Sequence, residues 1–566
     1  MRLSRHLRSL AFRRFPGKLG AVRTSWASPF KRSRYLAAVL AGALLAASFP
    51  NIGLAGLAWI APALMLAAAL GKSGAESFRI GYVAGLAYYL ASLCWLLLIP
   101  YRWHSIPLGP GAGWFSLSAY VALYPATWVW LLCPVGVLAR SWTQRTLWAI
   151  YGAALWVALE MLVGRLFTGF PWNPLGASQY QMVPLIQIAS VTGIYGVSFL
   201  IVWVSLSLLS AGLMIVLRPT ARSAWVSEII LPALVVGLVF NFGYRQLARE
   251  AVPDRTLNVA LIQPSIPQTL IWDTSRDMER FRELIRLSEQ ALTNRTDLLI
   301  WPEAAVPSYA RWDTNLYPAI TNLVRQHRVW LILGSDDLGR AAPPAPPDKY
   351  EFYNAAFLVR PDGEFVSRYI KRNLVVFGEY IPLVRWLPFV KWFTPIEGGF
   401  TSGDHPEPFV LSRPDARTSP LICFEDIFPH LGREASDDDI DFLVNLTNNG
   451  WFGEGAAQWQ HAAAAVFRAV ENGLPLVRCS NNGVTGWADA HGRLRQVFRD
   501  DHGTIYGPGY LTAQIPLLSL GEKRVPTYYH EHGDRFGWAC VGFVGIMLTT
   551  RILRHRRTAH PAGKPA

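Results

Sequence analysis

The first 249 residues of this chain almost lack acidic side chains, since only Glu76, Glu160 and Glu228 occur there. The whole chain is 16% charged and 51% hydrophobic, whereas charged residues make up about a quarter of an ordinary soluble domain. Between about 250 and 530, residues of both charges occur at ordinary density. This uneven distribution excludes a uniform soluble protein and predicts two parts, one built for a membrane and one for water.

Cysteine is also scarce, with five in 566 residues: Cys94, Cys133, Cys423, Cys479 and Cys540. Three of them lie in apolar runs, where a thiol is usually a small apolar filler. A disulfide between Cys423 and Cys479 is an alternative that an exported compartment permits. Phosphate-binding loops, dinucleotide fingerprints and zinc-ligand spacings are missing, so we expect neither a cofactor nor a metal.

The acid-poor part is filled by long apolar runs. A membrane-spanning helix needs about 20 apolar residues. Candidate runs cover residues 35–50, 54–71, 80–99, 113–139, 146–164, 192–217, 228–244 and 535–553. They predict a multi-pass α-helical membrane domain of about eight spans, seven within 35–246 and the eighth at 535–553. A large soluble helical core is the alternative.

Basic residues predict the orientation of these spans. The leader, residues 1–34, carries ten Lys or Arg and no acid, and the tail, residues 554–566, is basic too. Further basic residues occur in alternate loops, at Lys72, Arg79, Arg140, Arg145, Arg218 and Arg222. Since short cytoplasmic loops are enriched in Lys and Arg, we expect both termini in the cytoplasm and residues 250–530 in the periplasm, on a bacterial inner membrane. A nucleic-acid partner for the leader is the disfavoured alternative.

Residues 250–530 alternate short apolar runs with turn signals and helical patterns. Buried strands are predicted at LNVALIQPS, TDLLIWPEA, VWLILGSDD, SPLICFED and DFLVNLTNNG. A hairpin over 353–371 turns at Pro-Asp-Gly, and a helix over 456–472 ends at Gly473. Strands alternating with helices predict an α/β layered domain, in which chemistry gathers where the strands end.

Three reactive side chains, Glu303, Lys371 and Cys423, each stand at the end of a predicted strand. A thiol is mostly protonated at neutral pH, so it needs a base or a cation to become a nucleophile. Glu303 follows apolar Ile300 and Trp301, a setting that favours a general base. Lys371 could stabilise an oxyanion. The set predicts thiol-based acyl transfer, although a core thiol, a helix cap and a solvated lysine are the structural alternatives.

The segments IWPEAAVPSY, YIKRNLVVFGEYIPL and LICFEDIFP, in this order, resemble the three catalytic segments of the nitrilase superfamily, whose fold is α-β-β-α. With the predicted spans, FTGFPWNPLG and NNGWFGEG, the chain resembles the apolipoprotein N-acyltransferase family from about 35 to 550. The resemblance implies Glu303 as proton acceptor, Lys371 as oxyanion stabiliser and Cys423 as nucleophile. It also implies that Glu379 and Glu425 support them.

The resemblance further implies the substrates and partners. A membrane phospholipid is the expected acyl donor, and the amino group of a diacylglyceryl-cysteine apolipoprotein is the expected acceptor. The reaction is expected to be ping-pong through a cysteine thioester, to complete lipoprotein maturation, and to be carried out by a monomer. Trp272 and Trp451 match aromatic residues near the acyl-binding mouth of the family.

The segment RWLPFVKWFTP interleaves aromatic residues, including Trp386 and Phe389, with Arg385 and Lys391. This pattern predicts a loop that dips into the lipid interface and helps to bind substrate. An ordinary helix packed on the domain is the alternative.

Other interpretations remain open at the level of sequence. A membrane-tethered nitrilase-like amidase would use water as acceptor, and a transporter would carry the exported part as a sensor. His461 could indicate a Cys–His enzyme, although a structural role is favoured. Glu160 lies within a predicted span, where a carboxylate needs a partner, and Arg165 is the candidate for an ion pair.

Overall fold

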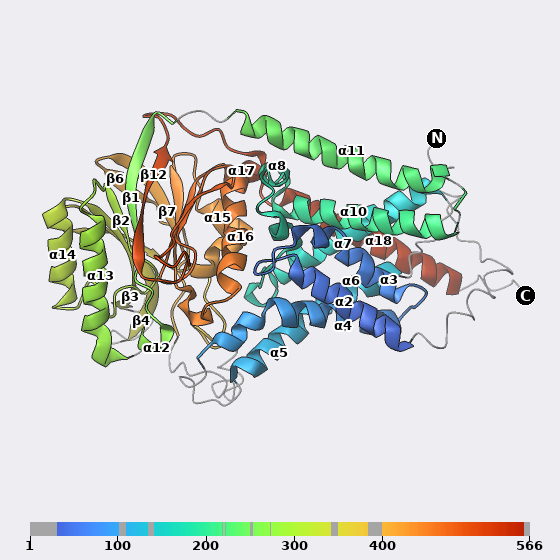
Figure 1. Cartoon of the computed structure of the whole chain (residues 1–566), viewed down its shortest axis with the longest axis horizontal. Coiled ribbons are helices and arrows are strands. Elements are labelled where there is room, and N and C mark those ends of the chain that lie inside the picture. Colours follow the sequence, from blue (N-terminus) through green and yellow to red (C-terminus); the bar gives the residue numbers. More distant parts are fainter. Residues whose placement is uncertain are drawn as a thin grey trace, which may run out of the picture.

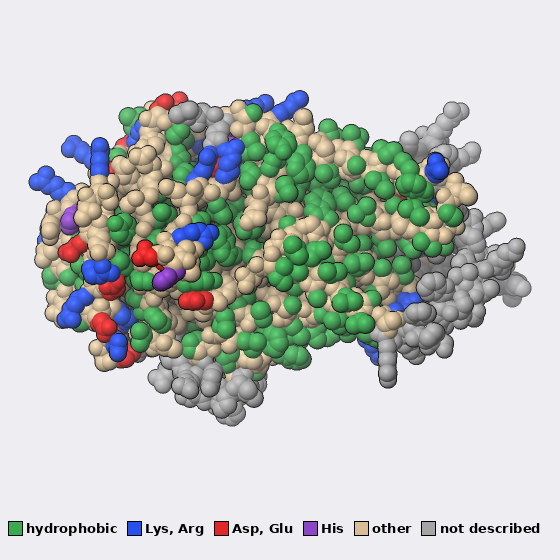
Figure 2. Space-filling view, viewed as in Figure 1, with side chains coloured by type: hydrophobic (Ala, Val, Ile, Leu, Met, Phe, Trp, Pro, Cys, Tyr) green, Lys and Arg blue, Asp and Glu red, His purple; other side chains and the backbone are tan. Residues whose placement is uncertain are grey.

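The computed structural model describes residues 31–100, 109–133, 141–217, 219–220, 222–249, 253–271, 273–340, 349–382 and 399–559. Strands lie at one end of the molecule and a bundle of helices at the other (Figure 1). Hydrophobic side chains cover the visible face of the bundle, whereas charged side chains concentrate over the strands (Figure 2). The predicted division into an apolar helical part and a charged part with strands is therefore confirmed.

The bundle is formed by α2 (Lys31–Ala47), α3 (Ala61–Ala69), α4 (Ala75–Ser92), α5 (Gly109–Val121), α6 (Leu123–Leu132), α7 (Trp142–Val163), α8 (Val183–Ile186), α9 (Ala189–Thr192), α10 (Ile194–Leu217), α11 (Arg222–Leu247) and α18 (Arg535–Ala559). Five helical segments are long and apolar enough to cross a membrane: Gly109–Leu132, Trp142–Val163, Ile194–Leu217, Arg222–Leu247 and Arg535–Arg554. They correspond to five of the eight predicted runs, and α2 and α4 account for two more.

Three of the predicted runs do not form single helices. The run 80–99 is divided at Leu93 between α4 and a 3-10 helix, η3 (Cys94–Leu98). Residues 54–71 divide into a 3-10 helix, η2 (Ala55–Trp59), and α3, in which Pro62 occupies the first turn. At 1.5 Å per residue α3 rises only about 14 Å, about half the hydrocarbon thickness of a bilayer, so residues 54–71 do not form one helix long enough to span a membrane. The run 113–139 is interrupted at Ala122 because Pro125 has no N–H for the carbonyl of Val121, and residues 134–139 lie outside the described part.

Helix ends that carry basic residues meet at the end of the bundle far from the strands (Figure 1). Arg34 donates to the carbonyls of Ala68 and Leu70, at 3.2 and 2.7 Å. At the same end, Arg145 Nε lies 2.6 Å from Glu228 Oε1, and both side chains are buried. Glu228, a rare acid of the apolar part, therefore neutralises a buried cation that joins α7 to α11.

This pair gives a prediction about stability. Arg145→Ala leaves Glu228 buried without a cation, so we expect the free energy of unfolding to fall by about 3–5 kcal/mol. The double variant Arg145→Met/Glu228→Leu should regain most of this loss, because no charge is then left buried. Thermal unfolding in detergent measures the effect.

Arg79→Ala is the matched control, since its pair with Glu76 is largely exposed and worth at most about 1 kcal/mol. An unchanged Tm in Arg145→Ala would contradict the prediction.

The strands form two six-stranded sheets, in the orders β12-β1-β2-β3-β4-β5 and β11-β10-β9-β8-β7-β6. The first contains β1 (Arg255–Gln263), β2 (Leu298–Ile300), β3 (Trp330–Arg340), β4 (Tyr350–Val359), β5 (Phe365–Ile370) and β12 (Gly509–Leu517). The second contains β6 (Phe409–Ser412), β7 (Asp415–Ile422), β8 (Phe442–Thr447), β9 (Leu476–Ser480), β10 (Gly486–Ala488) and β11 (Leu494–Val497). In each sheet the central strands are parallel, so their carboxyl ends share one edge.

Apolar side chains from both sheets form a common core that includes Ile300, Ile332, Leu358, Ile422 and Val444. Helices α13 (Asp277–Ala291) and α14 (Leu316–His327) cover the outer face of the first sheet. Helix α16 (Ala457–Asn472) covers the second sheet and separates it from the bundle (Figure 1). The layers are therefore α-β-β-α, as predicted.

Helix α16 fixes the sheets to the bundle, and all of its residues except Trp459 are buried. Gln460 Nε2 donates to the carbonyls of Pro50 and Ser92 at 2.7 and 3.1 Å. Its Oε1 accepts from the indole nitrogens of Trp95 and Trp172, at 3.1 and 2.8 Å. Since buried polar groups must be paired, these bonds specify how the two parts dock. Helix α16 therefore joins the second sheet to the helical bundle.

Candidate active site

Cys423 lies at the point where β7 turns into a 3-10 helix, η10 (Cys423–Ile427). Its φ of 53° is in the left-handed region, which is strained for a residue with a side chain. The side-chain amide of Asn445 holds the turn by donating to the Cys423 carbonyl at 2.7 Å. Such strain is often found at functional positions, and here it ends the strand and begins the helix at the thiol.

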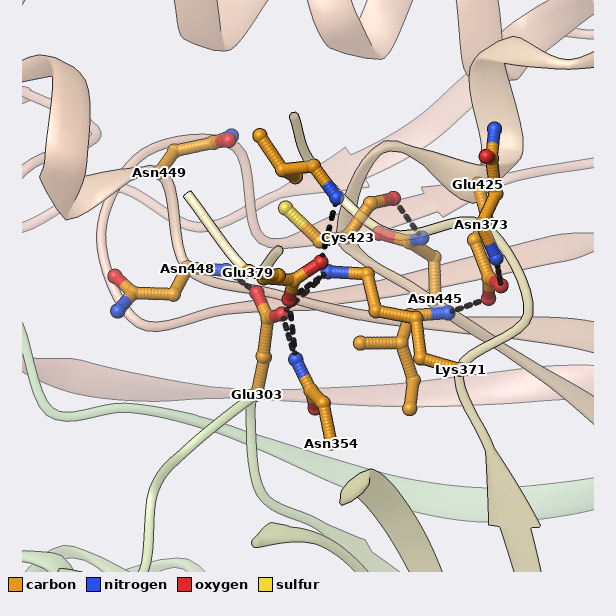
Figure 3. A network of polar contacts seen from close by, with 12 residues as sticks. Glu303, Asn354, Lys371, Asn373, Glu379, Cys423, Glu425, Asn445, Asn448 and Asn449 are labelled. Carbon is orange, nitrogen blue, oxygen red and sulfur yellow. Dashed lines mark hydrogen bonds and ion pairs between the residues drawn. The ribbon is translucent and has the colours of Figure 1, made fainter. Parts of the chain in front are cut away.

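Glu303 and Lys371 meet beside this turn (Figure 3). Lys371 directly follows β5, and Glu303 follows β2 by three residues. Lys371 Nζ lies 3.0 Å from Glu303 Oε1 and 2.7 Å from Glu379 Oε1, and all three residues are buried. Burial alone would lower the pKa of Lys371, but the charges of Glu303, Glu379 and Cys423 raise it well above its usual value. The lysine therefore stays a cation.

Two asparagines, which the sequence analysis did not identify, position these carboxylates. Asn354 Nδ2 donates to Glu303 Oε1 and Glu379 Oε1, at 2.8 Å each. The backbone N–H of Asn448 donates to Glu303 Oε2 at 2.9 Å. Strand alternation could have identified Asn354, because it is polar on the face of β4 whose next members, Ala356 and Leu358, enter the core. Asn448 gives no comparable signal, since its backbone makes the contact.

Glu425 is fully buried and accepts four hydrogen bonds. The donors are the backbone N–H groups of Ile422, Arg372 and Asn373, at 2.7, 2.6 and 3.1 Å, and the hydroxyl of Tyr369, at 2.8 Å. Burial raises the pKa of Glu425, although the three backbone N–H donors and the charge of Lys371 oppose the shift. One carboxylate thus ties the strand that ends at the thiol to the residues flanking Lys371.

The thiol itself is not activated at rest. Burial, and next the charge of Glu303, raise the pKa of Cys423 to about 12, while Lys371 and a hydrogen bond with Thr447 lower it. At neutral pH the sulfur therefore keeps its proton until a base removes it. The disulfide alternative is wrong: Cys423 and Cys479 are both free, and the Cys479 thiol donates to the carbonyls of Ile262 and Ile300 at 3.3 Å.

His461 is buried and has polar partners at both ring nitrogens. Nε2 lies 2.6 Å from Asp426 Oδ1, and Nδ1 lies 2.7 Å from an Arg478 nitrogen. Because arginine can only donate, Nδ1 must be the acceptor and Nε2 must carry the proton. Burial, and next Arg478, lower the pKa of His461 and keep it neutral. These contacts support the structural role rather than the Cys–His alternative.

The predicted pair between Glu160 and Arg165 does not form. Arg165 instead pairs with Asp534, just before α18, while Glu160 Oε1 accepts from Trp156 Nε1 at 2.9 Å and from the N–H of Leu175 at 2.7 Å. A spacing of five residues places two side chains on different faces of a helix. The true partner of Arg165 is 369 residues away, so no local pattern could indicate it.

Of the four aromatic residues predicted to bind substrate, the structure describes only Trp451. Trp451 is partly buried in η11 (Asn449–Phe452), next to Asn448, which contacts Glu303. Trp272, Trp386 and Phe389 lie outside the described residues, as do Arg385 and Lys391. The prediction that these residues bind substrate stays a prediction.

Residues 41–207 match the family model of the apolipoprotein N-acyltransferase N-terminal domain, and residues 258–512 match that of carbon-nitrogen hydrolases. The apolipoprotein N-acyltransferase of Geobacter metallireducens is 36% identical over 534 residues, which cover 94% of this chain and 97% of that protein. The protein of the same name from Methylococcus capsulatus is 34% identical over 93% of this chain and 97% of its own length. Among solved structures, a carbon-nitrogen hydrolase from Helicobacter pylori G27 is 17% identical, with a TM-score of 0.34 over 46% of this chain and 89% of that chain.

Proposed function

Since this chain belongs to the apolipoprotein N-acyltransferase family and is an acyltransferase, we propose that it moves an acyl chain from a membrane phospholipid to an apolipoprotein. The acceptor in this proposal is the N-terminal amine of a diacylglyceryl-cysteine. The observation that carries the proposal is the meeting of Glu303, Lys371 and Cys423 at strand ends. A base, a cation and a thiol are the groups that acyl transfer through a thioester requires.

In the first half of the proposed reaction, Glu303 accepts the proton of the Cys423 thiol. The sulfur attacks the ester carbonyl of the phospholipid, a C–S bond forms, and the carbonyl oxygen becomes an oxyanion that Lys371 stabilises. The oxyanion collapses, the ester C–O bond breaks, and Glu303 returns its proton to the leaving lysophospholipid. Asn354 and the N–H of Asn448 keep the carboxylate in place.

In the second half, the acceptor amine attacks the thioester that Cys423 carries. A C–N bond forms, the C–S bond breaks, and the amine loses a proton as the thiol is restored. Because one site serves two substrates in turn, the kinetics are expected to be ping-pong. Trp451 adjoins the backbone that contacts Glu303, a position that suits contact with the acyl chain.

The membrane setting follows from the same proposal. Both substrates are anchored by lipid chains, so a site beside the bundle receives them without extracting them from the bilayer. The basic helix ends lie at the end of the bundle far from the strands. Since basic ends favour the cytoplasm, this arrangement supports a bacterial inner-membrane protein whose strand part faces the periplasm.

The proposal is tested by incubating the purified protein with vesicles of acyl-labelled phospholipid and measuring the intact mass. We expect an acyl-sized increment that hydroxylamine removes and that Cys423→Ala lacks. An unmodified wild-type protein that nevertheless accumulates lysophospholipid would contradict the thioester mechanism. Discharge to water as fast as to a diacylglyceryl peptide would favour the amidase instead.

A further inference from the structure

Asp336 is a third carboxyl group beside the site, and no step of the proposed reaction uses it. It lies directly opposite Asn354 in the antiparallel pair of β3 and β4, so the two side chains share one face of the sheet. This is the inner face, because Ile332 and Leu358, at alternate positions on the same strands, enter the core between the sheets. Asp336 is only partly buried and therefore reaches the edge of the site.

The charges around Asp336 are not balanced. Lys371 Nζ is shared by two glutamates, Glu303 and Glu379, and the charges of all three act on Asp336. The side chain of Asp336 makes no hydrogen bond or ion pair to the rest of the described chain. Burial, and next Glu379 and Glu303, raise the pKa of Asp336 to about 7, against the opposing effect of Lys371. A second cation beside Asp336 would relieve this repulsion.

The side-chain oxygen of Asn354 is a second, independent observation that points to a ligand. Its Nδ2 faces two carboxylates, which can only accept, so the other terminal atom must be the carbonyl oxygen. That oxygen is buried and has no donor within the described ranges. A buried acceptor without a partner is costly, and a ligand that brings N–H donors would satisfy it.

Two aromatic rings lie on the same side of the sheet as the carboxyl group. Burial, and next the charges of Asp336 and Asp337, raise the pKa of Tyr309. Tyr309 stacks on Phe352 with ring centroids 6.4 Å apart, and Phe352 faces the same side of β4 as Asn354. Aromatic faces attract organic cations, and these two rings would pack against the carbon atoms next to a bound nitrogen.

We propose that Asp336 and the carbonyl oxygen of Asn354 form a subsite for a primary ammonium group brought by a substrate of this enzyme. The inference rests on the acyl transfer proposed above. The ammonium has two sources there, the N-terminus of the acceptor and an ethanolamine headgroup of the donor. A divalent metal ion fits less well, since Mg²⁺ and Ca²⁺ take six or more oxygen ligands and the described residues hold no cluster of three or more metal-binding side chains.

For the acceptor, the subsite also provides a path for a proton. An ammonium nitrogen has no lone pair, so one N–H bond must break before the nitrogen can attack the thioester. Asp336 is placed to accept that proton, forming an O–H bond and leaving a neutral amine beside the acyl group. The groups that face Asp336, namely Glu303, Glu379, Lys371 and Tyr309, set the pH at which it can do so.

The test uses the full-length protein and separates the two halves of the reaction. Asp336→Asn keeps the shape and removes the charge, Asp336→Glu keeps the charge, and Asp501→Asn is the control at an exposed aspartate. Acyl-enzyme formation is followed by intact mass with phosphatidylethanolamine and, separately, with phosphatidylglycerol. Discharge is followed with a synthetic diacylglyceryl-cysteine peptide, whose KM is measured between pH 5.5 and 8.

If the ammonium comes from the acceptor, Asp336→Asn forms acyl-enzyme normally from both lipids, but its KM for the peptide rises about 10-fold or more. The wild-type KM then rises below about pH 7, where Asp336 loses its charge, while that of Asp336→Asn stays high and flat. If the ammonium comes from the donor, only acylation from phosphatidylethanolamine slows. Asp336→Glu should partly restore the affected half-reaction.

Two results would overturn the subsite. One is an Asp336→Asn enzyme that matches wild type in both half-reactions, and the other is equal slowing with phosphatidylglycerol and phosphatidylethanolamine, which indicates a purely structural role. Failure of the underlying acyl transfer is distinguishable, because the wild-type protein would then form no acyl-enzyme from either lipid.

Discussion

Glu303→Gln is expected to reduce the rate of acyl-enzyme formation by about a thousandfold, within the range typical of a lost general base. The raised pKa of Cys423, about 12, leaves almost no thiolate at neutral pH, so the reaction depends on a base that takes the proton. Glutamine keeps the shape of the side chain and a carbonyl oxygen that can accept from Lys371 and Asn354. The glutamine NH2 would face the N–H of Asn448, so thermal unfolding of the variant is measured beside the rate to separate lost proton transfer from a disturbed site.

Single-turnover acylation with labelled phospholipid, followed by intact mass, measures this effect. Glu364→Gln is the control, because Glu364 is an exposed residue of the β4–β5 turn that pairs with Arg360. The control should acylate at the wild-type rate. Acylation of Glu303→Gln within tenfold of wild type would show that another group removes the thiol proton.

Glu425→Ala is expected to abolish acylation and also to destabilise the protein. The substitution leaves four donors without an acceptor, namely the N–H groups of Ile422, Arg372 and Asn373 and the hydroxyl of Tyr369. Each unsatisfied buried donor costs about 1–3 kcal/mol, so we expect the free energy of unfolding to fall by several kcal/mol. The affected backbone flanks both Cys423 and Lys371, so the relative positions of nucleophile and cation change as well.

The chain offers a matched control in Glu434, which pairs with the same Arg372 at 2.6 Å but is about half exposed. Glu434→Ala removes one exposed carboxylate and should cost at most about 1 kcal/mol, with acylation unchanged. Thermal unfolding in detergent and single-turnover acylation give the two readouts. If Glu425→Ala retained its Tm and lost only activity, Glu425 would act in the chemistry itself rather than as the support described above.

The buried ions of the site explain why its geometry is held so firmly. Lys371, Glu303 and Glu379 are all removed from water, where an unpaired charge would be costly. Each therefore needs its partners, and Asn354 adds a neutral donor between the two carboxylates. Removing one member leaves the others uncompensated. The proposed active residues and their structural support are consequently the same network in this part of the fold.

Much of this molecule was predictable because its signals are local. Apolar runs identify helices that cross a bilayer, since a helix satisfies its own backbone and needs only apolar side chains. Runs such as LICF and LLIW identify buried strands, and chemistry at their ends follows from parallel strands sharing an edge. Glu303, Lys371 and Cys423 were found in this way, and their order along the chain indicated the family.

Contacts between distant segments were not predictable, because no periodic pattern in the sequence indicates which distant segments meet. The sequence alone indicated an apolar part and a charged part, an α/β layered domain and three candidate reactive residues, since composition and alternation act over short stretches. The α-β-β-α class was implied by the resemblance of its motifs to a known superfamily. Only the tertiary structure decided that Arg165 pairs with Asp534, that Gln460 joins α16 to the bundle, and that Asp336 faces Asn354 beside the carboxylates. The reason is physical: burial forces each polar group to find a partner wherever the fold brings one within reach.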